Sequence, residues 1–146
     1  MFYCVNPTAP DIDKIYNPGI LISLPSKAAD ANTRFAGVHN INLIKEFNSW
    51  TPTSLDLTSA TKLNTFELTG SSDKLTEIKL DNSRLLNYVT ITQCSGLQTL
   101  SFANTINLKT LNLSYNEKLT SLTLPNTAPL TELNLEGCSS LNELTL

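Results

Sequence analysis

The segment LKTLNLSYN, residues 108–116, contains the pattern on which the fold of this chain depends. Its first, fourth and sixth residues are apolar: Leu108, Leu111 and Leu113. The first leucine returns every eleven residues, except for one step of twelve that follows Leu63. The starting leucines are Leu63, Leu75, Leu86, Leu97, Leu108, Leu119, Leu130 and Leu141. A fixed period of this kind indicates a repeat architecture.

We number each repeat unit from its starting leucine as position one. Positions four and six are two residues apart, so in a strand their side chains share one face. Positions three and five then point outward, and they are polar nearly everywhere, as Thr110 and Asn112 are. Eleven residues are too few for a strand, a helix and two turns. Each unit is therefore predicted to be a short strand plus a turn, and two units close a coil of about 22 residues.

These features predict an all-β solenoid in which two parallel sheets lie back to back around a leucine core. It covers residues 52–146, because an incomplete earlier unit begins at Pro52 and includes Leu55 and Leu57. An amphipathic helix is the competing interpretation of the LxxL spacing. A period of 3.6 residues does not fit the pattern over eight units, however, so the solenoid is preferred.

The first 51 residues do not follow the repeat. Residues 1–33 are predicted to be an irregular leader broken by prolines, with one strand candidate at residues 20–24. Residues 34–51 are predicted to cap the first coil, because terminal repeats are usually atypical. Phe35, Phe47 and Trp50 are expected to cover the open end. A separately folded N-terminal domain is the alternative.

Position nine is a small or polar residue in every unit: Ala60, Ser71, Ser83, Cys94, Thr105, Asn116, Thr127 and Cys138. The repeat thereby resembles the strand segment of leucine-rich repeats, LxxLxLxx followed by Asn, Cys or a small polar residue. The chain is similar to the short bacterial type in internalin-J-like surface proteins, in which both halves of each coil carry the motif. This resemblance implies the fold of residues 52–146 but no single function, because repeat scaffolds have many binding roles.

A second resemblance concerns the sequence RFAGVHNINLIKEFNSWTPTSLDLTSATKL, residues 34–63. It is similar to the segment that precedes leucine-rich repeats in tail-associated proteins of gut bacteriophages. The resemblance implies a protein of a phage virion.

The composition narrows the classes of partner. The net charge is -3 with only 10 Lys and Arg, and these are scattered, so we expect no nucleic-acid partner. No apolar run approaches membrane-spanning length, so we expect no membrane insertion. Charged residues make up only 16% of the chain, and about a third of it is Thr, Ser or Asn. This composition favours an extracellular location, on a virion or on a bacterial cell surface.

Cys94 and Cys138 occupy position nine in units that lie two coils apart on the same sheet. Their backbones are then about 10 Å apart, which is beyond the reach of a disulfide. We expect an inward structural ladder, Cys94–Asn116–Cys138, that satisfies backbone groups of the turns. The three cysteines and His39 show no metal-ligand spacing, so neither a metal nor a cofactor is expected.

The sequence offers little for catalysis. His39 is the only histidine, so a nucleophile with an adjacent base is not expected. Outward acids lie on both predicted sheets: Asp56, Glu77, Asp81 and Glu143 on one, and Glu67, Glu132 and Glu136 on the other. Glu132 and Glu136 lie in one coil but have no basic partner nearby in the repeat. We therefore expect no enzymatic activity, and a carbohydrate-active solenoid is the remaining enzyme alternative.

The leading functional hypothesis is a non-catalytic structural or adhesion module, a protein–protein scaffold in a larger extracellular or phage virion assembly. Its partners would be protein subunits, either copies of this chain or other chains. The alternative is a bacterial surface adhesin that binds a host protein or a glycan. Interfaces are usually centred on aromatic residues and arginine, and the repeat offers Tyr88, Tyr115 and Arg84 as candidates.

The C-terminal residue, Leu146, occupies position six of its unit, so the sequence stops on a strand without a polar cap. Such an end would expose a leucine layer and an unpaired strand edge. The expectation is that the natural protein continues past Leu146 or that another subunit covers this end.

Overall fold

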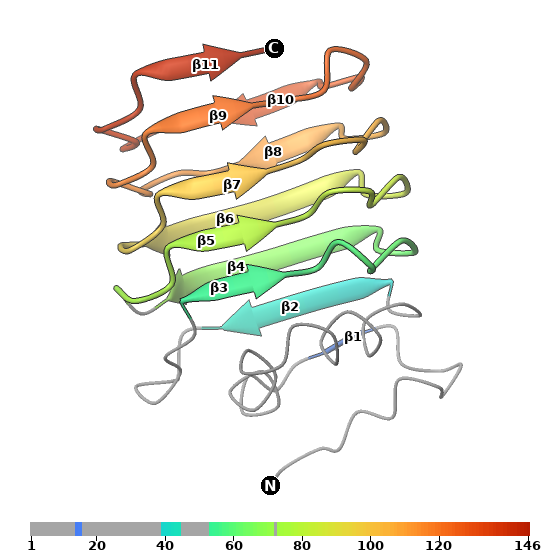
Figure 1. Cartoon of the computed structure of the whole chain (residues 1–146), viewed down its shortest axis with the longest axis horizontal. Coiled ribbons are helices and arrows are strands. Elements are labelled where there is room, and N and C mark those ends of the chain that lie inside the picture. Colours follow the sequence, from blue (N-terminus) through green and yellow to red (C-terminus); the bar gives the residue numbers. More distant parts are fainter. Residues whose placement is uncertain (1–13, 16–38, 45–52, 72) are drawn as a thin grey trace, which may run out of the picture.

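The computed structural model describes residues 14–15, 39–44, 53–71 and 73–146. In these ranges every regular element is a β-strand, and the strands form two sheets (Figure 1). Sheet A contains, in spatial order, β1 (Lys14–Ile15), β2 (Asn40–Ile44), β4 (Thr65–Ser71), β6 (Tyr88–Cys94), β8 (Thr110–Asn112) and β10 (Glu132–Asn134). Sheet B contains β3 (Ser54–Asp56), β5 (Glu77–Lys79), β7 (Thr99–Ser101), β9 (Ser121–Thr123) and β11 (Glu143–Thr145).

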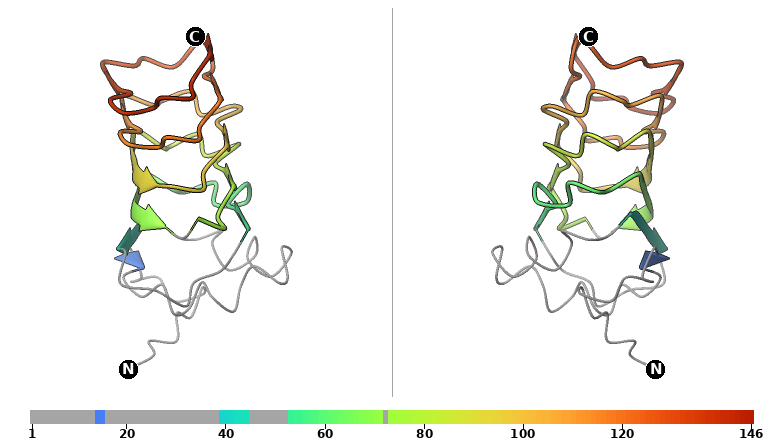
Figure 2. Two further views of the ribbon diagram at one scale, coloured as in Figure 1. Left: turned by 90° about the vertical axis from the view of Figure 1, so that its left-hand side faces the viewer. Right: turned by 90° about the vertical axis from the view of Figure 1, so that its right-hand side faces the viewer.

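From β2 onward, successive strands alternate between the two sheets, so the chain winds as a solenoid. The strand pairings are parallel, and Figure 2 shows the sheets as opposite walls of the stack. From β5 onward, strands of successive coils pair residues 22 positions apart, as Leu111 of β8 pairs with Leu133 of β10. The predicted all-β solenoid with two parallel sheets and coils of about 22 residues is confirmed.

The one step of twelve residues in the repeat is absorbed by a turn. Ser71 of β4 pairs with Cys94 of β6, a separation of 23 residues, whereas Glu77 of β5 pairs with Thr99 of β7, a separation of 22. The extra residue therefore lies between Ser71 and Glu77. Because a turn accommodates it, every inward side chain keeps its place in the strands.

The core is a stack of apolar layers between the two sheets. Positions one, four and six are inward, and in the unit of β8 these are Leu108, Leu111 and Leu113, each at most 1% exposed. Phe66 and Phe102 are the largest fully buried side chains. Each fully buried leucine stabilises the fold by about 1.5–3 kcal/mol, so the regular core is the main source of stability.

The described part of the N-terminal region adds two strands to sheet A. β1 lies within residues 1–33, expected to be irregular, and pairs with β2. β2 lies within the predicted cap and pairs in register with β4, with Ile41 opposite Phe66 and Leu43 opposite Leu68. The strand candidate at residues 20–24 and the aromatic side chains at 35, 47 and 50 lie outside the described residues.

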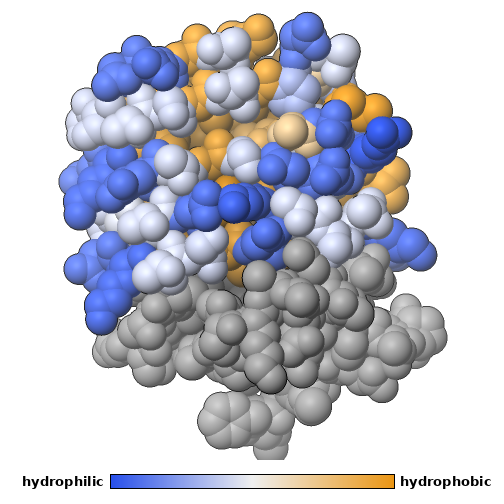
Figure 3. Space-filling view, in the orientation of Figure 1, coloured by the Kyte–Doolittle hydropathy of each residue, from blue (hydrophilic) through white to orange (hydrophobic). Residues whose placement is uncertain are grey.

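The last described coil is less buried than the coils before it. Leu144 of β11 is 46% exposed and Leu146 is 65% exposed, whereas Leu122, which pairs with Leu144, is 1% exposed. In Figure 3 hydrophilic residues cover much of the described face, and hydrophobic atoms are visible at the end occupied by β11.

The residue at position eight, at the end of a long strand or in the turn after a short one, has a positive φ in six of the units. These residues are Gly70, Asn82, Gln93, Asn104, Tyr115 and Gly137, with φ between 57° and 72°. In this conformation the backbone N–H donates to the next coil, as Gln93 N does to Ser114 O (3.1 Å) and Tyr115 N to Glu136 O (2.6 Å). Asn and Gly tolerate it, but a side chain such as Gln or Tyr is strained there.

Replacing Leu122 by aspartate should lower the free energy of unfolding by several kcal/mol, because the carboxylate would be buried without a partner. The matched control is Thr123→Asp, on the same strand but exposed, which should change stability by less than about 0.5 kcal/mol. Urea denaturation followed by circular dichroism measures both. Equal losses would show that the assignment of inward and outward faces is wrong.

Gln93→Gly should raise the free energy of unfolding by about 1 kcal/mol, because it relieves a positive φ of 57°. Gln98→Gly is the control, because Gln98 is an exposed residue directly before β7 without a positive φ and should lose stability with glycine. Gly137→Ala should destabilise, since its Cβ would lie 2.6 Å from Tyr115 Cδ1. Thermal melts compare the three variants. A loss of stability in Gln93→Gly would contradict the inference that the backbone is strained at position 93.

Candidate functional site

The predicted ladder centres on Asn116, which is fully buried in the turn after β8. Its Nδ2 donates to Ile91 O and Leu113 O, each at 2.7 Å, and its Oδ1 accepts from Cys94 N at 3.0 Å. One side chain thus satisfies three backbone groups in two adjacent coils. Asn116 therefore has a structural role, because both N–H groups of its side-chain amide donate to backbone carbonyls within the protein.

The two cysteines of the ladder have free thiols and different exposure. Cys94 is buried, and Cys138 is only partly buried because it lies in the last described coil. Cys138 Sγ donates to Leu113 O at 3.0 Å, and desolvation raises the pKa of its thiol. Both thiols therefore fill space in the core and do not form a reactive centre.

Two of the residues at position nine that follow strands of sheet B also form side-chain hydrogen bonds with backbone carbonyls. Ser83 Oγ donates to Ala60 O at 3.3 Å, and Thr105 Oγ1 donates to Phe102 O at 2.6 Å, with both side chains fully buried. Thr127 differs, because it is exposed in a turn that contains Pro125. At Ser83 and Thr105, the hydroxyl at position nine therefore satisfies a backbone carbonyl.

The three interface candidates do not come together. Tyr88 begins β6 and is 37% exposed, whereas Tyr115 follows the opposite end of β8 and is 46% exposed. Arg84 lies in the turn between β5 and β6 and is exposed, and its carbonyl accepts from Asn107 Nδ2 (2.7 Å). Tyr115 is already engaged, since its hydroxyl donates to Glu136 Oε1 at 2.6 Å, and this bond raises the pKa of Tyr115.

Several of the outward acidic residues form hydrogen bonds or ion pairs with neighbouring side chains. Glu132 Oε2 accepts from Thr110 Oγ1 at 3.3 Å in the neighbouring strand, and Glu136 accepts from Tyr115. Lys79 and Glu77 form an ion pair at 3.4 Å on β5. Among the described residues, no group of three or more His, Cys, Asp and Glu could hold a metal ion.

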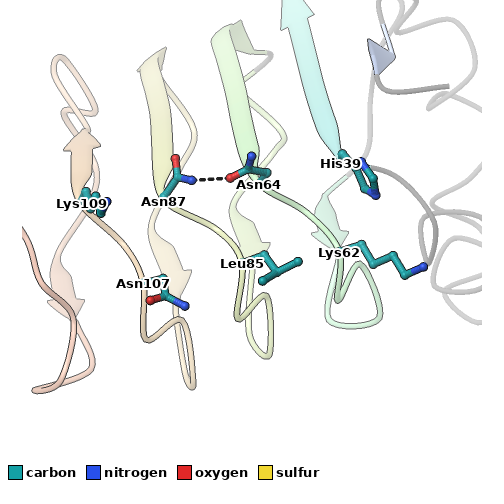
Figure 4. A pocket seen from close by; sticks show the side chains of 7 residues that line it. All are labelled: His39, Lys62, Asn64, Leu85, Asn87, Asn107 and Lys109. Atoms are coloured by element: carbon teal, nitrogen blue, oxygen red, sulfur yellow. Dashed lines mark hydrogen bonds between the residues drawn. The ribbon is translucent and has the colours of Figure 1, made fainter. Parts of the chain in front are cut away.

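A groove that the sequence analysis did not identify lies where the chain passes from sheet B to sheet A (Figure 4). It has a volume of about 370 Å³, and we call it the corner groove. One column of its side chains is at position eleven: Lys62, Leu85 and Asn107. The second column is formed by His39 and by position two of the following units: Asn64, Asn87 and Lys109. The sequence does carry a signal for this groove: asparagine or lysine recurs at positions eleven and two, on either side of the leucine at position one.

Comparisons with protein-family models, with curated proteins and with solved structures gave no match. The chain is therefore characterised by its architecture, a β-solenoid repeat protein of about four turns. Within the described ranges, no helix has the length and hydrophobicity needed to cross a bilayer.

The exposure of the thiols predicts their reactivity. In the folded protein Cys94 should resist alkylation by iodoacetamide, because it is 0% exposed, and Cys138 should react slowly because its pKa is raised. Both should react fully after denaturation without reductant. Peptide mass spectrometry locates each adduct, and rapid modification of Cys94 in the folded state would contradict the ladder.

Proposed function

We propose that this chain is a leucine-rich-repeat solenoid that acts as a non-catalytic binding scaffold within a larger extracellular assembly, such as a virion or a bacterial surface structure. The low fraction of charged residues supports the extracellular setting. The leucine-rich-repeat identity is supported by the LxxLxLxxN pattern at residues 108–116 together with the inward Asn116.

The observation that carries the proposal is the outward face of sheet A from β4 to β10. It presents aligned rows of mostly uncharged polar side chains: Thr65, Glu67, Thr69, Tyr88, Thr90, Thr92, Thr110, Asn112, Glu132 and Asn134. Tyr88 lies in the middle of one row, between Thr65 and Thr110. The centres of protein interfaces are likewise depleted in charge and enriched in tyrosine.

The regular backbone adds to the suitability of this face for a protein partner. Its strands are fixed by the parallel ladder, so little conformational entropy is lost when a partner binds. Sheet B is less suited, because β3 and β5 carry Asp56, Glu77 and Lys79 side by side on its outward face. Sheet A is therefore the proposed contact surface, with Tyr88 as its anchor.

A photo-crosslinking amino acid, benzoylphenylalanine, tests this surface when it replaces Tyr88 in the protein within its native assembly. Irradiation should link the Tyr88 position to one discrete polypeptide, and an excess of the purified chain should reduce the product. The matched control replaces Thr123, an exposed outward residue of β9 in sheet B, and should give no discrete product. Equal products from both positions, or none from position 88, would contradict the proposal.

A further inference from the structure

The corner groove lies on the turns and does not overlap the outward face of sheet A. Its two columns of side chains flank the leucines at position one, Leu63, Leu86 and Leu108, which are fully buried. The groove therefore runs along the solenoid axis, and the buried leucines at position one lie beneath it. Successive coils are about 4.8 Å apart, so each coil contributes one residue of each column at a regular interval.

The charges on this side of the molecule are unevenly distributed. The turns from sheet B to sheet A, residues 57–64, 80–87, 102–109 and 124–131, contain Lys62, Arg84 and Lys109 but only one acid, Asp81. The Asp81 carboxylate is occupied, since it accepts from Ser101 Oγ (2.9 Å) and from Ala103 N (2.6 Å). In a chain of net charge -3, this corner is thus a local cationic surface.

The amides of the groove are held in place and keep hydrogen-bonding capacity. Asn87 Nδ2 donates to Asn64 Oδ1, so this bond leaves the amide nitrogen of Asn64 and the amide oxygen of Asn87, which lie on the same side of it (Figure 4). Asn107 Nδ2 donates to Arg84 O at 2.7 Å, which leaves its oxygen as an acceptor among the described residues. Alternating amide donors and acceptors suit ligands whose hydroxyls both donate and accept.

The groove also offers an apolar surface between its polar groups. Leu85 lies between Lys62 and Asn107 in its column and is 54% exposed. Small-ligand sites usually combine such apolar area with a few polar groups that fix orientation. The C–H face of a sugar ring has the matching chemistry, with hydroxyls around an apolar centre.

We propose that the corner groove binds an acidic oligosaccharide, one whose sugars carry carboxylates. Lys62 and Lys109, which lie at opposite ends of the groove (Figure 4), pair with carboxylates of different sugars. Asn64 and Asn87 hydrogen-bond the hydroxyls, and Leu85 contacts the ring. A nucleic acid is disfavoured, because among the described residues no Phe, Tyr or Trp lines the groove and its lining residues include only two lysines. A peptide strand is disfavoured, because the groove lies on turns and not at a sheet edge.

The test is isothermal titration of the whole chain with trigalacturonate and, in a second arm, with sialyllactose, since both carry the shared carboxylate. At least one should bind. The probe with the lower dissociation constant shows whether the groove prefers uronic acids or sialic acids. Raising the salt from about 20 to 300 mM should weaken binding. Fully methyl-esterified trigalacturonate should bind about tenfold more weakly, because the rings are kept but the charges are lost.

The variant Lys62→Gln/Lys109→Gln should also lose about tenfold in affinity. Lys74→Gln/Lys118→Gln is the matched control, because it removes the same charge from exposed turns on the opposite side and should leave affinity unchanged. The proposal is overturned if neither acid sugar binds, if the ester binds equally well, or if both double variants behave alike. It is also overturned if inorganic phosphate binds as tightly as the sugars. Since Tyr88 is untouched, these outcomes are independent of the crosslinking result.

Discussion

The structure depends on one constraint, that each coil must place the same backbone groups opposite those of the next coil. The strands are short, most of them three residues, so the ladder continues through the turns. Asn87 O accepts from Lys109 N, for example, and Thr76 O accepts from Gln98 N, both at 2.9 Å. An extra residue within a strand would shift these partners and move the inward leucines out of their layers, whereas the extra residue between Ser71 and Glu77 leaves the strand pairing in register.

Two turn positions make this continuous ladder possible. Position eight takes a positive φ and directs its N–H to the next coil, at the expense of strain where the residue is Gln93 or Tyr115. Position nine is buried and satisfies the carbonyls that the sharp turn leaves unpaired, most completely at Asn116. The core leucines supply most of the stability, but the turns determine that the coils stack in register.

The same regularity shapes the two proposed surfaces. Outward residues of successive strands form rows on sheet A, so the exposed Tyr88 lies within a flat and mostly uncharged array. Residues beside the buried leucines form columns at the corner, which gather Lys62, Asn87 and Lys109 around one groove. Neither surface needs a special loop, since each arises from the repetition of one position from coil to coil.

The sequence by itself determined the coil length, the inward and outward positions and the parallel pairing, because a period of eleven with apolar positions one, four and six admits one arrangement of short strands. It also placed Asn116 at an inward turn position. The tertiary structure decided what the period leaves open. It located the extra residue between Ser71 and Glu77, and it left Cys138 only partly buried in the last coil.

The tertiary structure also decided which distant residues become neighbours on the surface. Lys62, Leu85 and Asn107 are more than twenty residues apart in sequence, and they line one groove only because coils of 22 and 23 residues bring them into a column. Tyr88 and Tyr115 remain apart, because they lie at opposite ends of parallel strands in sheet A. Periodicity specifies the face of each side chain, whereas a site depends on three-dimensional neighbours that only the stacked coils create.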